Sequence, residues 1–557
     1  MIEALTPPLL SVALVLVIVL ASALTLLGSV ALLSLYRRQV LRAMAASAGG
    51  AGFVVPPMSA IGPPPARAAA RATAAAGLLF DRALREPRIA ALHGAIAGAV
   101  FALVLTAAAG LAWPEMRTPY RLALLAWGYA WPIVLALVLT GPGGARAAAL
   151  ALGLYFAPLI AITAGAVLAP QALPAMFGGD FAALRAATTP FDIARTWLLG
   201  NAAPTLLLLL FLNRRLRAVG PLMLGFMTTV SIGAVVMLLF LLTNDGTALM
   251  LRLALASGVQ VQWWLLGVVA AAMALFGALG WVLLQWLRHG YLRKTLNDRS
   301  LTLDALWLVF GSFYALWLAL SGLLWAATVL PGFVLYKATA ALLQKLGTAA
   351  PNPARGLTFL RVFSLGPRSD RLLDALARHW RRIGSLHLIT GPDVAHSTVQ
   401  PHQLLDFVAG RLASHFVGDA HTLEQRMQQR DTAPDRDGWY RINNFFCHAD
   451  TWQAVLARLV QGGDVVLMDL RSFTAQHAGC VHELRHLVNF VPLGRCVLLF
   501  DASTDLAFVR ETLQQAWRDI DPRSPNRTMS PEALALHRFE AGQPALHQLL
   551  RRLCDAG

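Results

Sequence analysis

The segment from His482 to His486 has the residue types and the spacing of a zinc-peptidase motif. It spells His-Glu-Leu-Arg-His and therefore matches the pattern HExxH. On a helix, histidines four residues apart lie on one face and bind zinc, while the glutamate activates water. A charged Arg485 is unusual in the buried helix of such a peptidase, and no third ligand stands at a recognisable spacing. A zinc metallopeptidase therefore remains an alternative, and we expect no metal at these residues.

Polar side chains also follow two of the apolar segments near the C-terminus. Ser364 ends the segment 358–364 and Arg368 follows it, while Asp469 lies at the end of the segment 464–470 and Arg471 directly after it. If these segments are parallel strands, a ligand binds beyond their carboxyl ends, and we expect the four side chains to bind it. The sequence contains neither GxGxxG nor GxxxxGK[ST], which argues against an ordinary Rossmann dehydrogenase or a P-loop ATPase.

The periodicity after Pro351-Asn352-Pro353 predicts an α/β domain over residues 347–557. Short apolar runs alternate with amphipathic segments, which is typical of a Rossmann-like parallel sheet covered on both faces. The expected strands are 358–364, 386–391, 464–470 and 495–500. The expected helices are 368–382, 401–415, 450–461, 479–489 and 505–518. Residues 419–448 are expected to be polar and irregular apart from Trp439–Ile442.

The order of these segments resembles that of TIR domains. Val362-Phe363-Ser364, Gly366 and Asp370-Arg371 are similar to the first strand and following loop of the family, and Trp452–Leu487 resembles its later core. The similarity covers much of the C-terminal domain and none of the part before it. The resemblance implies the same α/β fold.

The resemblance also implies an activity for Glu483. In NAD-cleaving members, the glutamate of a Cys-x-x-Glu-Leu segment is catalytic, and that segment matches Cys480–Leu484. Arg368 and Arg471 then suit the pyrophosphate of NAD, because guanidinium groups bind phosphate oxygens in pairs. This sequence departs from the family at Gly479, where many members have Trp, and in the longer segment 392–448. Many TIR domains are adaptors without activity, so a non-catalytic module is the alternative.

The composition before residue 350 is that of a membrane protein. The whole chain is 57% hydrophobic and 14% charged, and apolar runs long enough to cross a bilayer recur up to about Tyr336. We expect a helical transmembrane domain over residues 1–346. The expected spans are 9–36, 89–112, 122–140, 147–168, 197–213, 219–243 and 258–287, followed by a run at 305–336 that breaks at Ser321-Gly322 or at Pro331-Gly332. The number of crossings is eight or nine.

The basic residues predict the orientation. With the N-terminus outside, sixteen Lys and Arg residues fall in inside loops and five in outside loops, as the positive-inside rule requires. The C-terminal domain is expected inside, where its free cysteines fit a reducing compartment. None of the expected spans has an Asp, Glu, Lys or Arg in its interior, which disfavours an ion-coupled carrier. Residues 43–77 are expected to form a mobile cytoplasmic loop.

Together these features predict a multi-pass protein of the inner (plasma) membrane that acts as a signalling or effector protein. Its cytoplasmic domain is expected to bind or hydrolyse NAD, as an NAD glycohydrolase with Glu483 as the catalytic residue. The expected partners are the lipid bilayer, NAD or a related nucleotide, and further copies of the chain. No cofactor is expected, and no basic-aromatic pattern suggests nucleic acid. A non-catalytic membrane sensor is the alternative function.

Overall fold

The computed structural model divides the chain into two compact units. It describes residues 7–46, 66–141, 145–168, 190–213, 216, 219–347, 354–362, 367–390, 401–462 and 464–556. One unit contains Met1–Leu33 and Ala90–Gly347, and the other contains Ser34–Ile89 and Thr348–Gly557. The second unit therefore includes Ser34–Ile89, a stretch that the sequence alone groups with the membrane segments.

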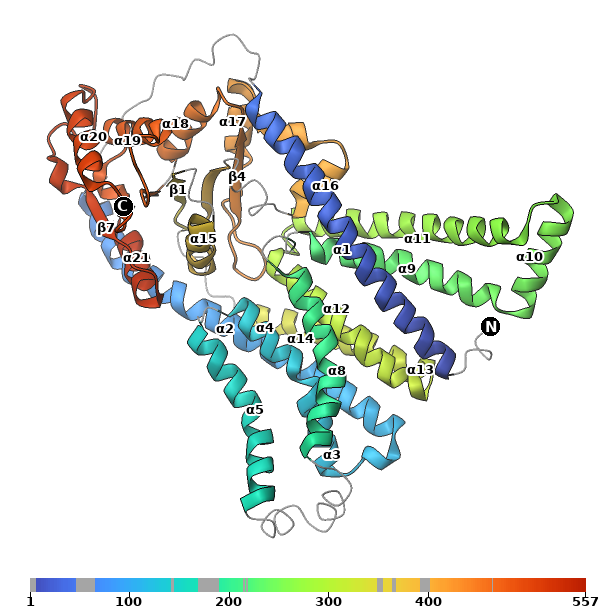
Figure 1. Cartoon of the computed structure of the whole chain (residues 1–557). Coiled ribbons are helices and arrows are strands. Elements are labelled where there is room, and N and C mark those ends of the chain that lie inside the picture. Colours follow the sequence, from blue (N-terminus) through green and yellow to red (C-terminus); the bar gives the residue numbers. More distant parts are fainter. Residues whose placement is uncertain are drawn as a thin grey trace. The chain divides into compact units, whose positions relative to one another are not determined.

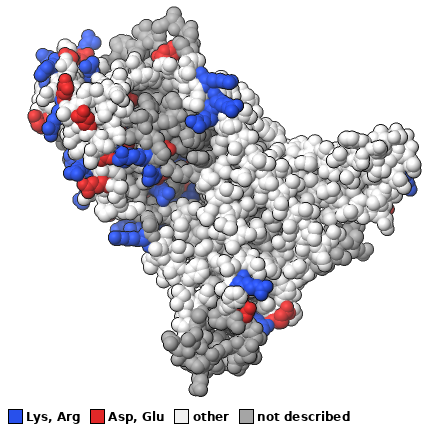
Figure 2. All heavy atoms as spheres, viewed as in Figure 1, with Lys and Arg blue, Asp and Glu red and all other residues white. Residues whose placement is uncertain are grey.

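The first unit is built from apolar helices. They are α3 (Pro119–Tyr129), α4 (Trp131–Thr140), α5 (Ala145–Leu168), α8 (Pro190–Phe211), α9 (Gly220–Leu241), α10 (Asn244–Ser257), α11 (Val261–Leu292), α12 (Asp298–Leu318), α13 (Leu323–Ala327) and α14 (Val329–Gly347), with parts of α1 (Pro7–Ala45) and α2 (Ala66–Ala112). Among the described residues, eight segments are long and apolar enough to cross a membrane. Figure 2 shows a broad face of this unit with few charged side chains. The chain is a multi-pass membrane protein.

The run expected at 305–336 forms a helical hairpin. The break lies at Gly322, whose φ of 115° favours glycine, whereas Pro331 lies inside α14. Lys337 Nζ of α14 lies 2.8 Å from an Asp304 carboxylate oxygen of α12. Asp304 and Lys337 each lie one residue outside the run expected at 305–336. The helices of the hairpin are longer than that run and therefore contain an ion pair that the sequence did not place within a span.

The second unit contains a parallel sheet of seven strands (Figure 1). The strands are β1 (Leu357–Arg361), β2 (Leu386–Thr390), β3 (Phe416–Val417), β4 (Ile442–Cys447), β5 (Val465–Asp469), β6 (Cys496–Phe500) and β7 (Ala535–Arg538). Their order is β3-β4-β2-β1-β5-β6-β7. In the register of β1 and β5, Arg361 stands opposite Asp469, so both lie at the carboxyl edge.

Helices cover both faces of this sheet, as the continuous apolar strands predict. Successive strand residues point to opposite faces: Val466 and Met468 join one buried cluster, and Val465 and Leu467 join the other. The first cluster includes residues of α17 (Ala420–Gln428), α18 (Trp452–Gly462), α19 (Ala478–Phe490) and α20 (Leu506–Arg518). The second includes residues of α15 (Pro367–Trp380), α21 (Gln543–Asp555) and the first half of α2.

Three expectations about secondary structure are wrong. Residues 419–448 are not irregular, because they contain α17 and β4, and β4 extends the sheet beside β2. The helix expected at 401–415 ends at Val408 as α16 (Pro401–Val408) and is followed by a 3-10 turn at Leu412–His415. The loop expected at 43–77 is helical at both ends, since α1 continues to Ala45 and α2 begins at Ala66. Residues 47–65 lie outside the described part.

Candidate functional site

The candidate site lies where the strand order of the sheet reverses. From β1 the chain passes through α15 to β2 on one side, and it later enters β5 on the other side of β1. Segments that follow β1 and β5 therefore leave the sheet in opposite directions, and in open α/β sheets this point is where ligands bind. The first turn of α15 and the residues after β5 and β6 supply the polar groups there.

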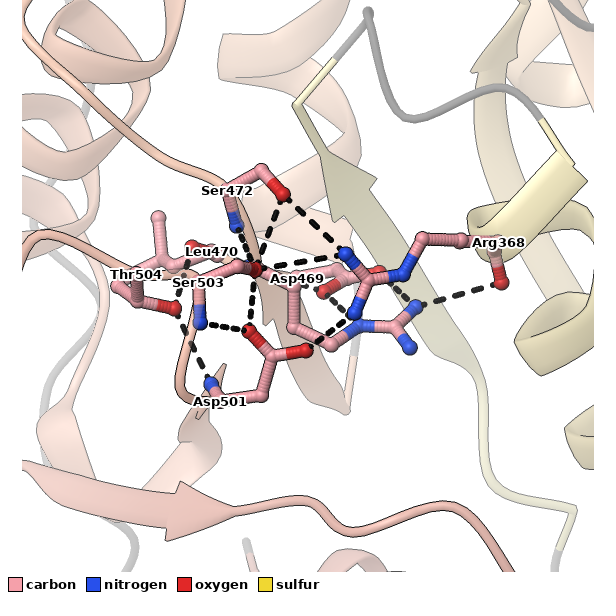
Figure 3. A network of polar contacts seen from close by, with 8 residues as sticks. Arg368, Asp469, Leu470, Ser472, Asp501, Ser503 and Thr504 are labelled. Atoms are coloured by element: carbon pink, nitrogen blue, oxygen red, sulfur yellow. Dashed lines mark hydrogen bonds and ion pairs between the residues drawn. The ribbon is translucent and has the colours of Figure 1, made fainter.

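Arg368 of α15 connects these segments (Figure 3). Its Nη2 lies 2.6 Å from Asp501 Oδ2, directly after β6, and its Nη1 lies 3.5 Å from the hydroxyl groups of Ser472 and Ser503. The Ser503 backbone N–H donates to Asp501 Oδ1 at 2.9 Å. Although burial alone would raise the pKa of Asp501, the bonds from Ser503 and the charge of Arg368 lower it overall. Asp501 is therefore an anion that holds a half-exposed guanidinium.

Ser472 has a backbone conformation that side chains rarely adopt. Its φ is 58°, in the left-handed region that is costly for residues other than glycine. The Ser472 N–H donates to the Ser503 hydroxyl at 3.1 Å, and the two hydroxyl oxygens lie 3.0 Å apart. Contacts between the β5 and β6 loops thus hold a strained turn at the edge of the site.

Arg471 is fixed by a buried carboxylate. Its Nε and Nη2 donate to the two oxygens of Asp469 at 2.8 and 2.7 Å, and Asp469 is completely buried. Arg471 Nη2 also lies 3.5 Å from the Arg368 backbone oxygen, and its guanidinium lies 5.5 Å from the ring centre of Phe539. In this arrangement Asp469 orients Arg471 and is itself out of reach of solvent.

Glu483 lies in the second turn of α19 and is buried, with 1% of its surface exposed. It is therefore not a surface residue of its helix. Burial raises its pKa to about 8, and the charge of Arg361 only partly opposes this. Its Oε2 has no hydrogen-bond partner among the described residues. Such a carboxyl is mostly protonated at neutral pH.

No family model, no curated protein and no solved structure matches this chain. Of the expected site residues, Arg368, Asp469 and Arg471 lie together, whereas Ser364 is outside the described residues. Within the described part, no hydrogen bond joins Glu483 to either arginine. Ser472, Asp501 and Ser503 were not assigned to the site from the sequence. Their positions directly after strands 464–470 and 495–500 were the available signal.

The HExxH segment has another structural explanation. The rings of His482 and His486 lie 6.2 Å apart, His482 packs against Trp452, and His486 packs against Phe490. Burial lowers the pKa of His486 to about 4, which keeps the ring neutral. Across the described residues, no group of three His, Cys, Asp or Glu side chains is placed to hold a metal ion. The pair therefore lacks a third ligand there.

Proposed function

We propose that this protein is a membrane-anchored signalling or effector protein whose α/β unit binds a nucleotide of the NAD class. The network of Arg368, Arg471, Ser472 and Ser503 at the carboxyl edge is the observation that carries the proposal. It places two guanidinium groups and two hydroxyl groups from separate segments at one point. Guanidinium and hydroxyl groups are the donors that a pyrophosphate requires.

The strand order supports a binding site at this edge. Without β3 and β4, the strands β2-β1-β5-β6-β7 run in the order 2-1-3-4-5, which is the flavodoxin-like order of doubly wound sheets. Sheets of this order bind their ligand between the first and third strands, which here are β1 and β5. A Rossmann-like fold of the TIR type has this architecture, and we propose it for the unit.

Hydrolysis of NAD is the reaction that we propose for Glu483. Water attacks the ribose carbon, the bond to the nicotinamide nitrogen breaks, and the bonding electrons leave with neutral nicotinamide. The attacking water releases one proton to the solvent and becomes the new ribose hydroxyl. A carboxylate near the ribose stabilises the positive charge that develops on the sugar. Only the ionised form of Glu483 does this, so the reaction should accelerate as the pH rises toward the pKa of about 8.

The burial of Glu483 favours a second function, that of a non-catalytic sensor or interaction module. A side chain that is 1% exposed meets a substrate only after the surrounding segments move. In addition, Arg368 and Arg471 are already paired with Asp501 and Asp469. In this second function, the unit binds its ligand or partner and does not convert it chemically.

The distribution of basic residues supports an inner-membrane location with the α/β unit in the cytoplasm. Eight described segments qualify as spans, and α5 contains a further apolar stretch at Arg146–Ala161. Nine crossings from an outside N-terminus bring the C-terminus inside. This count agrees with the inside excess of Lys and Arg.

The test uses the full-length protein in lipid nanodiscs with NAD, and measures both binding and nicotinamide release. Arg368→Ala should weaken binding, while Arg458→Ala should not. Arg458 is a matched control because it also forms an ion pair with a carboxylate, at 2.7 Å from Glu424. Binding without release supports the sensor. If NAD does not bind at all, the nucleotide proposal fails.

A further inference from the structure

The first half of α2 belongs to the core of the α/β unit. Ala76, Leu79 and Ala83 are at most 4% exposed and join the same buried cluster as the apolar residues of α15 and α21. An alanine-rich helix face permits close approach because its side chains are short. This helix occupies the position of a covering helix, although the whole membrane part from Ala90 to Gly347 separates it from the sheet in the sequence.

Two polar contacts fix α2 against the carboxyl end of α15. His379 Nδ1 lies 3.1 Å from the Ala83 backbone oxygen. Arg382 Nη1 lies 4.0 Å from Glu86 Oε2, and the Arg382 side chain is only 2% exposed. Arg382 also donates to the Asp437 backbone oxygen, and removal of the Glu86 charge takes away one attraction from a guanidinium that stays buried. The docked position of α2 is therefore favoured by charge as well as by packing.

Helix α15 reaches the candidate site at its other end. Helix α15 carries Arg368 in its first turn and His379 in its last, about 17 Å apart along the axis at 1.5 Å per residue. Phe539, which lies against Arg471, packs on the same buried cluster and precedes α21 by a few residues. Arg368 lies in α15, and Arg471 lies against Phe539. Both α15 and Phe539 belong to the buried cluster that includes α2.

We propose that the first half of α2 is a positioning element of the candidate site. Docked α2 holds α15 and the segment before α21 in place, and thereby sets where Arg368 lies relative to Asp501 and Arg471. Helix α2 continues to Ala112 in the membrane unit. Pro87, which lacks the N–H that a helix interior needs, is the point where it bends most readily. A shift of α2 therefore changes the spacing of the two arginines.

The positioning role is tested by hydrogen exchange on the full-length protein in nanodiscs, which requires no ligand. Glu86→Gln removes the charge next to Arg382, and Asp81→Asn is the matched control on an exposed position of the same helix. We expect Glu86→Gln to speed exchange severalfold in α15 and at residues 470–473, with strand β6 unchanged. Asp81→Asn should leave all these rates as in the parent.

Equal exchange in Glu86→Gln and the parent overturns the proposal. A uniform increase that includes β6 overturns it as well, because it indicates general loss of stability. The consequence for binding rests on the proposed function and is measured separately with NAD, whose affinity should fall severalfold in Glu86→Gln. If the parent does not bind NAD but its exchange pattern changes as expected, the nucleotide proposal fails and the positioning role stands.

Discussion

Asp469 and Arg471 form a buried ion pair with two parallel hydrogen bonds, 2.8 and 2.7 Å long, at the carboxyl end of β5. The side chains are 0% and 7% exposed. Arg471 Nη2 also lies 3.5 Å from the backbone oxygen of Arg368, so the pair links the core of the sheet to the candidate site.

Asp469→Asn should destabilise the α/β unit strongly. The change leaves the Arg471 guanidinium buried without its counter-charge, which costs about 3–5 kcal/mol. The measurement is thermal unfolding of the full-length protein in detergent. Glu424→Gln is the control, because Glu424 is half-exposed in its pair with Arg458 and such pairs contribute about 0–1 kcal/mol. Equal effects of the two changes would contradict a structural role for Asp469.

Glu483→Gln should stabilise the unit at alkaline pH. The pKa of Glu483 is raised from 4.5 to about 8 in the folded protein. The folded state therefore binds the proton more tightly than the unfolded state, and stability falls as the pH rises from 4.5 to about 8. Gln keeps the shape of the protonated acid and cannot ionise. Tm measured between pH 5 and 9 should fall less in the variant, and parallel curves would refute the buried state of Glu483.

His387 should destabilise the unit in acid. Burial lowers its pKa from 6.5 to about 4, so the unfolded state binds the proton more readily. Stability is fully present above pH 6.5 and is lost as the pH falls toward 4, by up to roughly 3 kcal/mol. His387→Asn should flatten this part of the Tm profile, even if it lowers the plateau. His421→Asn, a change at an exposed site, is the control and should not alter how Tm falls with decreasing pH.

Residues 347–557 should not form a stable unit alone. Without α2, the apolar surface of α15 and α21 that covers Ala76, Leu79 and Ala83 is exposed to water. We expect this fragment to aggregate, and co-expression with residues 66–89 to increase its soluble yield. The soluble yield of the two preparations, measured by size-exclusion chromatography, tests this. If the 347–557 fragment is monomeric and has the same Tm with and without residues 66–89, α2 is dispensable for the stability of the unit.

Reporter fusions test the orientation of the membrane unit. Fusions at Gly50, Gly220 and Gly557 should all report the cytoplasm, because the inside excess of Lys and Arg fixes the first span and the chain makes nine crossings in all, the first one included. A fusion in the segment before Pro119 should report the opposite side. A periplasmic signal at Gly557 would remove the C-terminal unit from the compartment that contains NAD.

The sequence by itself determined the elements whose signal is local. Apolar runs of spanning length predict the membrane helices, because each run alone must satisfy the hydrocarbon core. The strands β1, β2, β5 and β6 were predicted within a few residues, since a strand buried on both faces appears as a continuous apolar run. The sequence also predicted that Arg368 and Arg471 lie close together. They follow β1 and β5, and the carboxyl ends of parallel strands lie at one edge of the sheet.

Only the tertiary structure decided the features that depend on distant contacts. Strand β4 and helix α17 lie in a polar segment whose local pattern is weak. Strand β4 forms because β2 offers an edge for pairing, and α17 packs Leu423 and Met427 into a buried cluster. The burial of Glu483 depends on how α19 packs on the sheet, which the pattern around Cys480 does not reveal. Likewise, the start of α2 up to residue 77 looks like part of a loop in the sequence. The first half of α2 is a core helix because α15 and α21 provide the surface that buries it.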